Sequence, residues 1–321
     1  MEPLETGLDA CCRRILLRGD LASKLEAPPD QGLEAGATPT PPAMPTPIPT
    51  PMPPSTPPLM PPLMPPLTPP PMPPPLMPPP NRPARDPDLA MEGGAAALPR
   101  PGELADPSLR AVCLARFAHH ELMAVELFAW ALLRWPEVPL GLRRGWRDAL
   151  ADEQRHCRLY LERLADLGSQ LSDHPQSDYF WKQVPGFDAS PHGPRAFLAG
   201  LGLTLEQANL DFTLAYRDAF REAGDEASAR VFEQVYQDEI QHVALAARWL
   251  ARLSPEDADD PVAAYAAAVP YPLAASRAKG RRFNAEGRRA AGLSEPFIEY
   301  VRRARSSQEL ASAGRPPGER P

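Results

Sequence analysis

The sequence contains the pattern Asp-Glu-x-x-His twice, at residues 152–156 and 238–242. Side chains three positions apart lie on one face of an α-helix, so the Glu and the His of each copy can bind the same site. Carboxylate oxygen combined with imidazole nitrogen suits iron or manganese, and it is a poor set for a structural tetrahedral zinc. The repeated pattern therefore predicts a metal site.

Each copy has a partner carboxylate earlier in the chain. Glu121 precedes Glu153 by 32 residues, and Glu206 precedes Glu239 by 33. In helical hairpins, such equal spacing brings both pairs to nearly the same height. Four carboxylates inside one apolar core are costly unless cations neutralise them, and two divalent ions match their charge. We predict a dinuclear site with the ligands Glu121, Glu153, His156, Glu206, Glu239 and His242.

Two further pairs of residues lie close to these ligands in the sequence. Asp152 and Asp238 directly precede the Glu of each copy, where they either orient the His ligands or remain solvated helix residues. Tyr160 and Tyr236 lie within one helical turn of a ligand, where they either form hydrogen bonds or take part in redox chemistry.

Other candidate residues are interpreted as structural. His119 and His120 point away from the face of Glu121, which favours surface or capping roles over metal binding. Glu126 lies far around the helix from Glu121 and is predicted to be peripheral. Cys157 is interpreted as a small buried residue.

Four long amphipathic helices must position the ligands. The apolar periodicity and the stop signals place them at residues 106–135, 139–167, 194–223 and 225–253. The first and second helices, and likewise the third and fourth, are joined by only a few residues, which forces antiparallel hairpins. The longer connection, residues 169–193, can cross the length of the bundle. This connectivity predicts an all-α fold of the ferritin-like four-helix type.

The 46 prolines divide the chain, because proline is excluded from the interior of packed helices. Most of them fall in a stretch that is close to pure polyproline II, with or without a partner that reads its PxxP motifs. The predicted divisions are an N-terminal helical segment docked on the bundle (1–27), a mostly disordered proline-rich linker (28–101), the bundle (102–254), a basic helical extension (255–305) and a disordered tail (306–321).

Charge and composition limit the functional classes. The net charge of −7 argues against nucleic-acid binding through the overall field, although the basic stretch 277–289 leaves an anion or RNA contact open. The sequence has no apolar run of the length that spans a bilayer. The N-terminus carries acids where a signal peptide needs bases, and the four cysteines form no CxxC motif. We expect a cytoplasmic protein without a membrane partner.

Four segments also resemble a known family: FAHHELMAVELFAWALL, ALADEQRHCRLYLERL, LTLEQANLDFTLAYRDAFREAGDE and VYQDEIQHVALAARWL. They resemble an uncharacterised bacterial ferritin-like family that is catalogued as a domain of unknown function. The resemblance covers ILLRGDLASKLEAPP and about residues 83–300, so the proline tract looks like an insertion. The ligand pattern is similar to that of bacterioferritin and rubrerythrin, and all six proposed ligands match it.

We expect two iron ions, or a mixed iron and manganese pair, as the cofactor, because the ligand set is rich in oxygen with one nitrogen per metal. The leading hypothesis is an oxidoreductase that activates O₂ or peroxide on an unknown small-molecule or RNA substrate. The alternatives are an iron-binding or ferroxidase protein and a metal-stabilised adaptor without turnover. Because the basic extension and the proline arm would obstruct a cage, we expect a monomer or a small oligomer.

Overall fold

The computed structural model describes residues 7–29, 78–91, 97–257 and 259–306. Within these ranges the regular structure is helical, apart from one isolated bridge between Met91 and Gln176, which confirms the all-α prediction. None of the described helices combines the length and the apolar character that crossing a bilayer requires. The predicted tail beyond residue 306, and residues 30–77 and 92–96 of the predicted linker, lie outside the described ranges.

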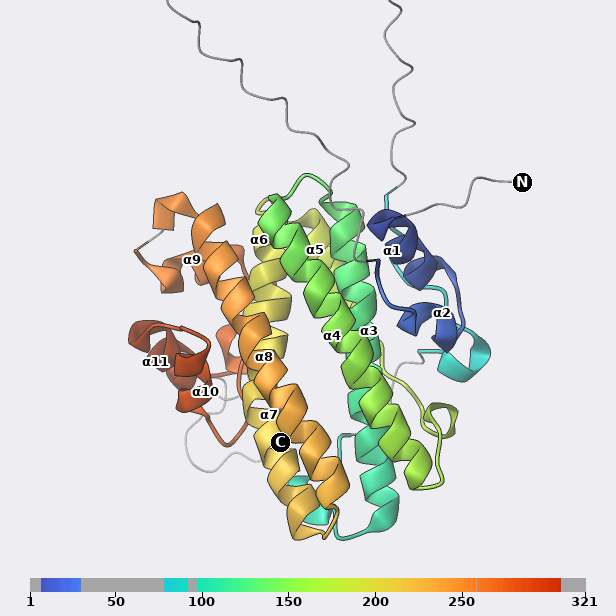
Figure 1. Ribbon diagram of the computed structural model, residues 1–321. Coiled ribbons are helices and arrows are strands. Elements are labelled where there is room, and N and C mark those ends of the chain that lie inside the picture. The colour runs from blue at the N-terminus through green and yellow to red at the C-terminus, as the bar shows by residue number, and fades with distance from the viewer. Residues whose placement is uncertain (1–6, 30–77, 92–96, 258, 307–321) are drawn as a thin grey trace, which may run out of the picture.

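The first long hairpin consists of α3 (Pro107–Arg134) and α4 (Leu140–Asp166), close to the predicted bounds. Helix α3 begins where the side chain of Asp106 accepts a hydrogen bond from Ser108 N at 2.8 Å, and proline occupies its first position. Gly168, with φ of +73°, follows the end of α4. The short connection makes the two helices antiparallel neighbours (Figure 1).

The second hairpin pairs α8 (Glu226–Leu253) with a helix that the sequence predicts as one regular element over residues 194–223. The structure divides that helix into α6 (Pro194–Phe197), the π-helix η5 (Leu198–Glu206) and α7 (Gln207–Glu222). Close packing accompanies the π-helix, since a Cβ added at Gly202 would lie 2.4 Å from the Cβ of Ala246 on α8. Glu206 is the last residue of the widened segment.

The connection between the hairpins contains η3 (Leu171–Asp173), η4 (Trp181–Gln183) and α5 (Val184–Ala189). It runs alongside α3. Trp181 Nε1 donates to Glu126 Oε2 at 2.8 Å, and Arg134 Nε pairs with Asp188 Oδ1 at 2.5 Å. The chain therefore returns along the bundle, and the second hairpin starts at the end where α5 and α6 lie in Figure 1.

The N-terminal residues pack beside the first hairpin. The helical segment predicted within residues 1–27 consists of two helices, α1 (Leu8–Leu17) and α2 (Leu21–Leu25). Residues 78–91, which contain η1 (Pro87–Leu89), run alongside them, and Ala84 N donates to Leu16 O at 2.8 Å. Part of the stretch predicted as a linker thus contacts the folded domain.

The C-terminal residues cover the second hairpin, on the opposite side of the bundle from α1 and α2 (Figure 1). They form η6 (Pro255–Asp257), α9 (Pro261–Ala268), η7 (Ala275–Arg277), α10 (Ala285–Ala290) and α11 (Glu295–Arg303). Within the basic stretch 277–289, Arg288 is fully buried and pairs with Asp211 at 2.7 Å. Desolvated charges persist only when they are paired, so this contact fixes the extension to α7.

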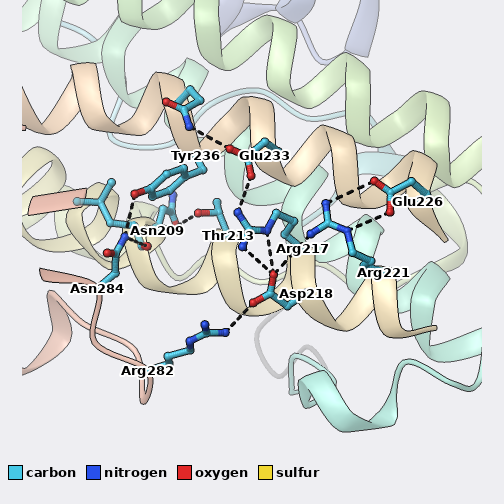
Figure 2. Close-up of polar contacts among 12 residues, drawn as sticks. Asn209, Thr213, Arg217, Asp218, Arg221, Glu226, Glu233, Tyr236, Arg282 and Asn284 are labelled. Atoms are coloured by element: carbon cyan, nitrogen blue, oxygen red, sulfur yellow. Dashed lines mark hydrogen bonds and ion pairs between the residues drawn. The ribbon is translucent and has the colours of Figure 1, made fainter. Parts of the chain in front are cut away.

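Charged side chains on the outer surface of the second hairpin pair with one another (Figure 2). Arg217 contacts Asp218 at 2.7 Å and Glu233 at 2.5 Å, and Arg282 of the extension reaches Asp218 at 2.6 Å. These partly exposed pairs contribute little stability individually. They show that Arg282 already has a carboxylate partner within the fold.

Candidate metal centre

All six predicted ligands lie inside the bundle, and each is at most 4% exposed. They come from four helical elements: Glu121 from α3, Glu153 and His156 from α4, Glu206 from η5, and Glu239 and His242 from α8. Each occupies a polar position in an otherwise apolar stripe, as the periodicity predicts. The fold therefore surrounds six polar side chains with apolar packing.

Two groups of potential ligand atoms converge at the centre. Ligand atoms of Glu121, Glu153 and His156 lie within 4.8 Å of one another, and so do those of Glu153, Glu206 and His242. Glu153 belongs to both groups: its Oε1 is 3.1 Å from His242 Nδ1 and its Oε2 is 3.7 Å from His156 Nδ1. Glu239 lies beside the second group, with Oε2 3.9 Å from His242 Nδ1.

The donor atoms fit a metal pair because several of them have no hydrogen-bond partner outside the centre. Buried polar atoms are almost always hydrogen-bonded in folded proteins, and exceptions call for an ion or another explanation. Among the described residues, the following atoms of this centre make no hydrogen bond of acceptable geometry: Glu153 Oε1 and Oε2, Glu206 Oε1, Glu239 Oε2, His156 Nδ1 and His242 Nδ1. Divalent cations would satisfy this oxygen-rich set with one nitrogen each.

The two aspartates of the repeated pattern each hold the histidine of the other copy. His156 Nε2 lies 3.0 Å from Asp238 Oδ2, and His242 Nε2 lies 3.3 Å from Asp152 Oδ2. With Nε2–H directed at a carboxylate, each imidazole turns its Nδ1 toward the centre, which is the arrangement that orients histidine ligands in metal proteins. Arg155 contacts both aspartates at 2.8 Å. One guanidinium thus links the two halves.

Burial dominates the protonation of the carboxylates in the metal-free protein. Desolvation and the nearby charge of Glu153 raise the pKa of Glu121 well above its usual value, and desolvation likewise raises the pKa of Glu206. Desolvation raises the pKa of Glu239 to about 7. Burial by itself would also raise the pKa of Glu153, but polar contacts with Glu121 and the two histidines outweigh it and hold that pKa well below the usual range.

The pKa values of the two histidines are set by their carboxylate contacts rather than by burial. Desolvation lowers the pKa of a buried imidazole, but the contacts of His156 with Asp238 and Glu153 outweigh it and raise the pKa to about 9. Contacts with Asp152 and Glu153 raise the pKa of His242 above its usual value in the same way. Without metal, protons therefore supply the positive charge that this group of carboxylates requires.

The two predicted tyrosines take different positions. Tyr160 is fully buried beside Phe117, with a hydroxyl that has no partner among the described residues, and burial raises its pKa. Tyr236 is only partly buried, and its hydroxyl accepts a hydrogen bond from Asn284 Nδ2 at 3.0 Å (Figure 2). Its polar end is thus held by the C-terminal extension.

Two expectations about neighbouring residues are wrong. Glu126, predicted to be peripheral, is fully buried and contacts Lys24 Nζ at 2.9 Å and Arg85 Nε at 2.7 Å. His119, predicted at the surface or in a cap, is also fully buried. At Glu126, segments distant in sequence cover a helix face that the periodicity assigns to solvent. Cys157 is buried, as predicted.

Asn209 is a residue of the centre that the motif analysis does not identify. Its Nδ2 donates to Glu239 Oε1 at 2.7 Å. The sequence holds one indication of this contact, because Asn209 lies one helical turn after Glu206 and therefore faces the same side of its helix.

Comparison with known families matches residues 69–299 to a family described as "Protein of unknown function (DUF455)". An "Uncharacterized protein" of Haemophilus influenzae is 26% identical to this chain over 188 residues. That match covers 52% of this chain and 64% of the relative, so the chain spans less than two thirds of the relative's length. No solved structure matches the chain. With most of its length matched, the chain belongs to the DUF455 family of proteins of unknown function.

Proposed function

We propose that this protein is a ferritin-like dinuclear metal carboxylate protein that carries two iron ions, or an iron and manganese pair, and acts as an oxidoreductase on O₂ or peroxide. The observation that supports it most directly is the convergence of buried carboxylates and imidazoles, several of whose atoms make no hydrogen bond among the described residues. A structural zinc site would instead close around Cys and His.

In this proposal, Glu121 and His156 would hold one ion and Glu206 and His242 the other. Glu153, which belongs to both groups, and Glu239, beside the second, would complete the ligand set. When bound, the pair supplies Lewis acidity and redox electrons. The chain supplies the geometry: Asp152 and Asp238 fix the imidazole rings, Arg155 fixes the aspartates, and apolar side chains above and below exclude water. Such fixed surroundings are what a protein contributes to cofactor chemistry.

The second candidate function is iron binding with ferroxidase activity, or metal binding that only stabilises the bundle. The same ligand set favours it, because holding two ions does not by itself require an organic substrate. Substrate identity and oligomeric state are proposals of the same kind: an unknown small molecule or RNA, and a monomer or small oligomer.

The test is metal analysis of protein produced in iron-supplemented medium, followed by an anaerobic spectrum and exposure to O₂. We expect close to two metal ions per chain and an absorption change with oxygen uptake. Metal without any spectral or oxygen response would favour the stabilising role, and absence of metal after attempted reconstitution would refute the site. His242→Leu should lose metal, whereas His119→Leu, a matched buried histidine outside the centre, should retain it.

A further inference from the structure

The π-helix η5 carries Glu206 as its last residue. A π-helix is rare and usually no longer than one turn, whereas η5 covers 9 residues. Glu206 Oε1 makes no hydrogen bond among the described residues, so the direction of this side chain depends largely on the backbone that carries it. The contacts that hold η5 therefore decide where Glu206 points.

One chain of hydrogen bonds supports η5 from α9. Thr204 Oγ1 donates to Ala199 O at 2.8 Å, and the hydroxyl of Tyr265 lies 2.7 Å from the same Oγ1. Because the threonine uses its only proton on the carbonyl, the tyrosine is the donor of the second bond. The threonine reaches back five residues, which is the spacing of a π-helix. Thr204 and Tyr265 are both fully buried.

A second chain of hydrogen bonds supports η5 from α10. The side-chain amide of Gln207 donates to Leu203 O at 2.7 Å and accepts from Arg288 Nε at 3.0 Å. Arg288 is itself fixed by its ion pair with Asp211. Gln207 and Arg288 are fully buried. Like the first chain, this one starts in the C-terminal extension and ends on a backbone carbonyl of η5.

The two chains reach η5 on either side of the ligand, since Thr204 lies two residues before Glu206 and Gln207 lies directly after it. We propose that Tyr265 and Arg288 are positioning residues of the metal centre, which keep η5 in its π-helical register and so direct Glu206 toward the other ligands. Shifting the hydrogen-bond pattern of a helix by one residue turns the side chains beyond the shift by roughly 100°. The inference rests on the proposed dinuclear centre. It gives the C-terminal extension a part in metal binding, although the extension supplies none of the six proposed ligands.

The probe is Mn²⁺, titrated into the metal-free protein and followed by calorimetry, which gives a dissociation constant for each of two ions. Tyr265→Phe removes the donor hydroxyl and keeps the ring. We expect it to weaken the binding of one ion by roughly three- to tenfold, the effect that one lost hydrogen bond supports, and to leave the other ion unaffected. Gln207→Leu should act in the same way through the second chain, because it leaves the ion pair of Arg288 with Asp211 in place.

The matched control is Tyr300→Phe. Tyr300 belongs to the same extension and its ring centroid lies 6.2 Å from that of Tyr265, but the residue is 37% exposed. This variant should bind both ions like the wild type. Thr204→Val interrupts the same chain as Tyr265→Phe, so the two substitutions together should weaken manganese binding no more than Thr204→Val alone.

Unchanged dissociation constants in Tyr265→Phe, or additive effects of Thr204→Val and Tyr265→Phe, would overturn the inference. Equal weakening of both ions together with a lower melting temperature in chelator would also overturn it, because a general loss of stability has that effect. Tyr265→Phe preserves the ring packing, so it decides the question even if Gln207→Leu fails to fold. Wild-type protein that binds no manganese or iron refutes the proposed function instead, which keeps the two failures distinct.

Discussion

Glu206→Leu should stabilise the metal-free protein while removing metal-dependent stabilisation. Glu206 is 4% exposed, its Oε1 has no hydrogen bond among the described residues, and burial raises its pKa. Replacing a buried polar group that lacks a partner by an apolar one removes a desolvation cost of about 1–3 kcal/mol. For a domain of this size, each kcal/mol shifts the melting temperature by about 2–4 °C. We therefore expect the melting temperature in chelator to rise by roughly 2–12 °C.

The increase in melting temperature should depend on pH. Glu206 has a folded-state pKa above its unfolded value of 4.5. As pH rises from the unfolded pKa toward the folded pKa, Glu206 loses its proton in the unfolded chain first, so the metal-free wild type loses stability. The variant lacks this contribution. Its advantage should therefore be small near pH 4 and should grow toward neutral pH.

The assay is thermal unfolding of wild type and variant, each with iron and with chelator, together with metal analysis. Glu126→Leu is the matched control, since Glu126 is also a buried glutamate but pairs with Lys24 and Arg85. Removing one partner of a buried ion pair costs about 3–5 kcal/mol, so this control should unfold at a lower temperature with or without metal. If Glu206→Leu behaves like the control, or keeps its metal, Glu206 is not a ligand.

Three further predictions follow from the same geometry. Metal binding at pH 7 should release more than one proton per chain. His156, with a pKa of about 9, and His242, whose pKa is also raised, must both lose a proton to bind. Calorimetry in buffers of different ionisation enthalpy measures the protons released, and metal affinity should rise with pH up to about 9. Arg155→Ala should lower metal affinity about tenfold, because it releases both aspartates that orient the histidines. Arg221→Ala, which breaks only an exposed ion pair, should leave metal affinity unchanged. Equilibrium dialysis measures the metal affinity of both variants. Deleting residues 37–77 should leave thermal unfolding of the domain unchanged, because a polyproline sequence buries little apolar surface. A clear loss of stability would contradict this.

The sequence by itself determined the local geometry of this protein. Helical periodicity and stop signals place the long helices within a few residues, because they reflect hydrogen bonds and apolar faces that repeat every turn. The repeated pattern puts Glu and His on one face for the same reason. Matched spacings of 32 and 33 residues then bring four helices to a common level, since each hairpin turn is short. The candidate ligands could thus be named before any fold was known.

Tertiary structure decided which groups those ligands face. Asp152 orients His242 and Asp238 orients His156. Each aspartate therefore contacts the histidine on the other helix, which neither copy of the pattern reveals by itself. Asn209 donates to Glu239 because α7 packs against α8 at that height. The physical reason is the same in each case: a buried polar group must find a partner, and the partner comes from whichever segment packs against it, however distant in the chain.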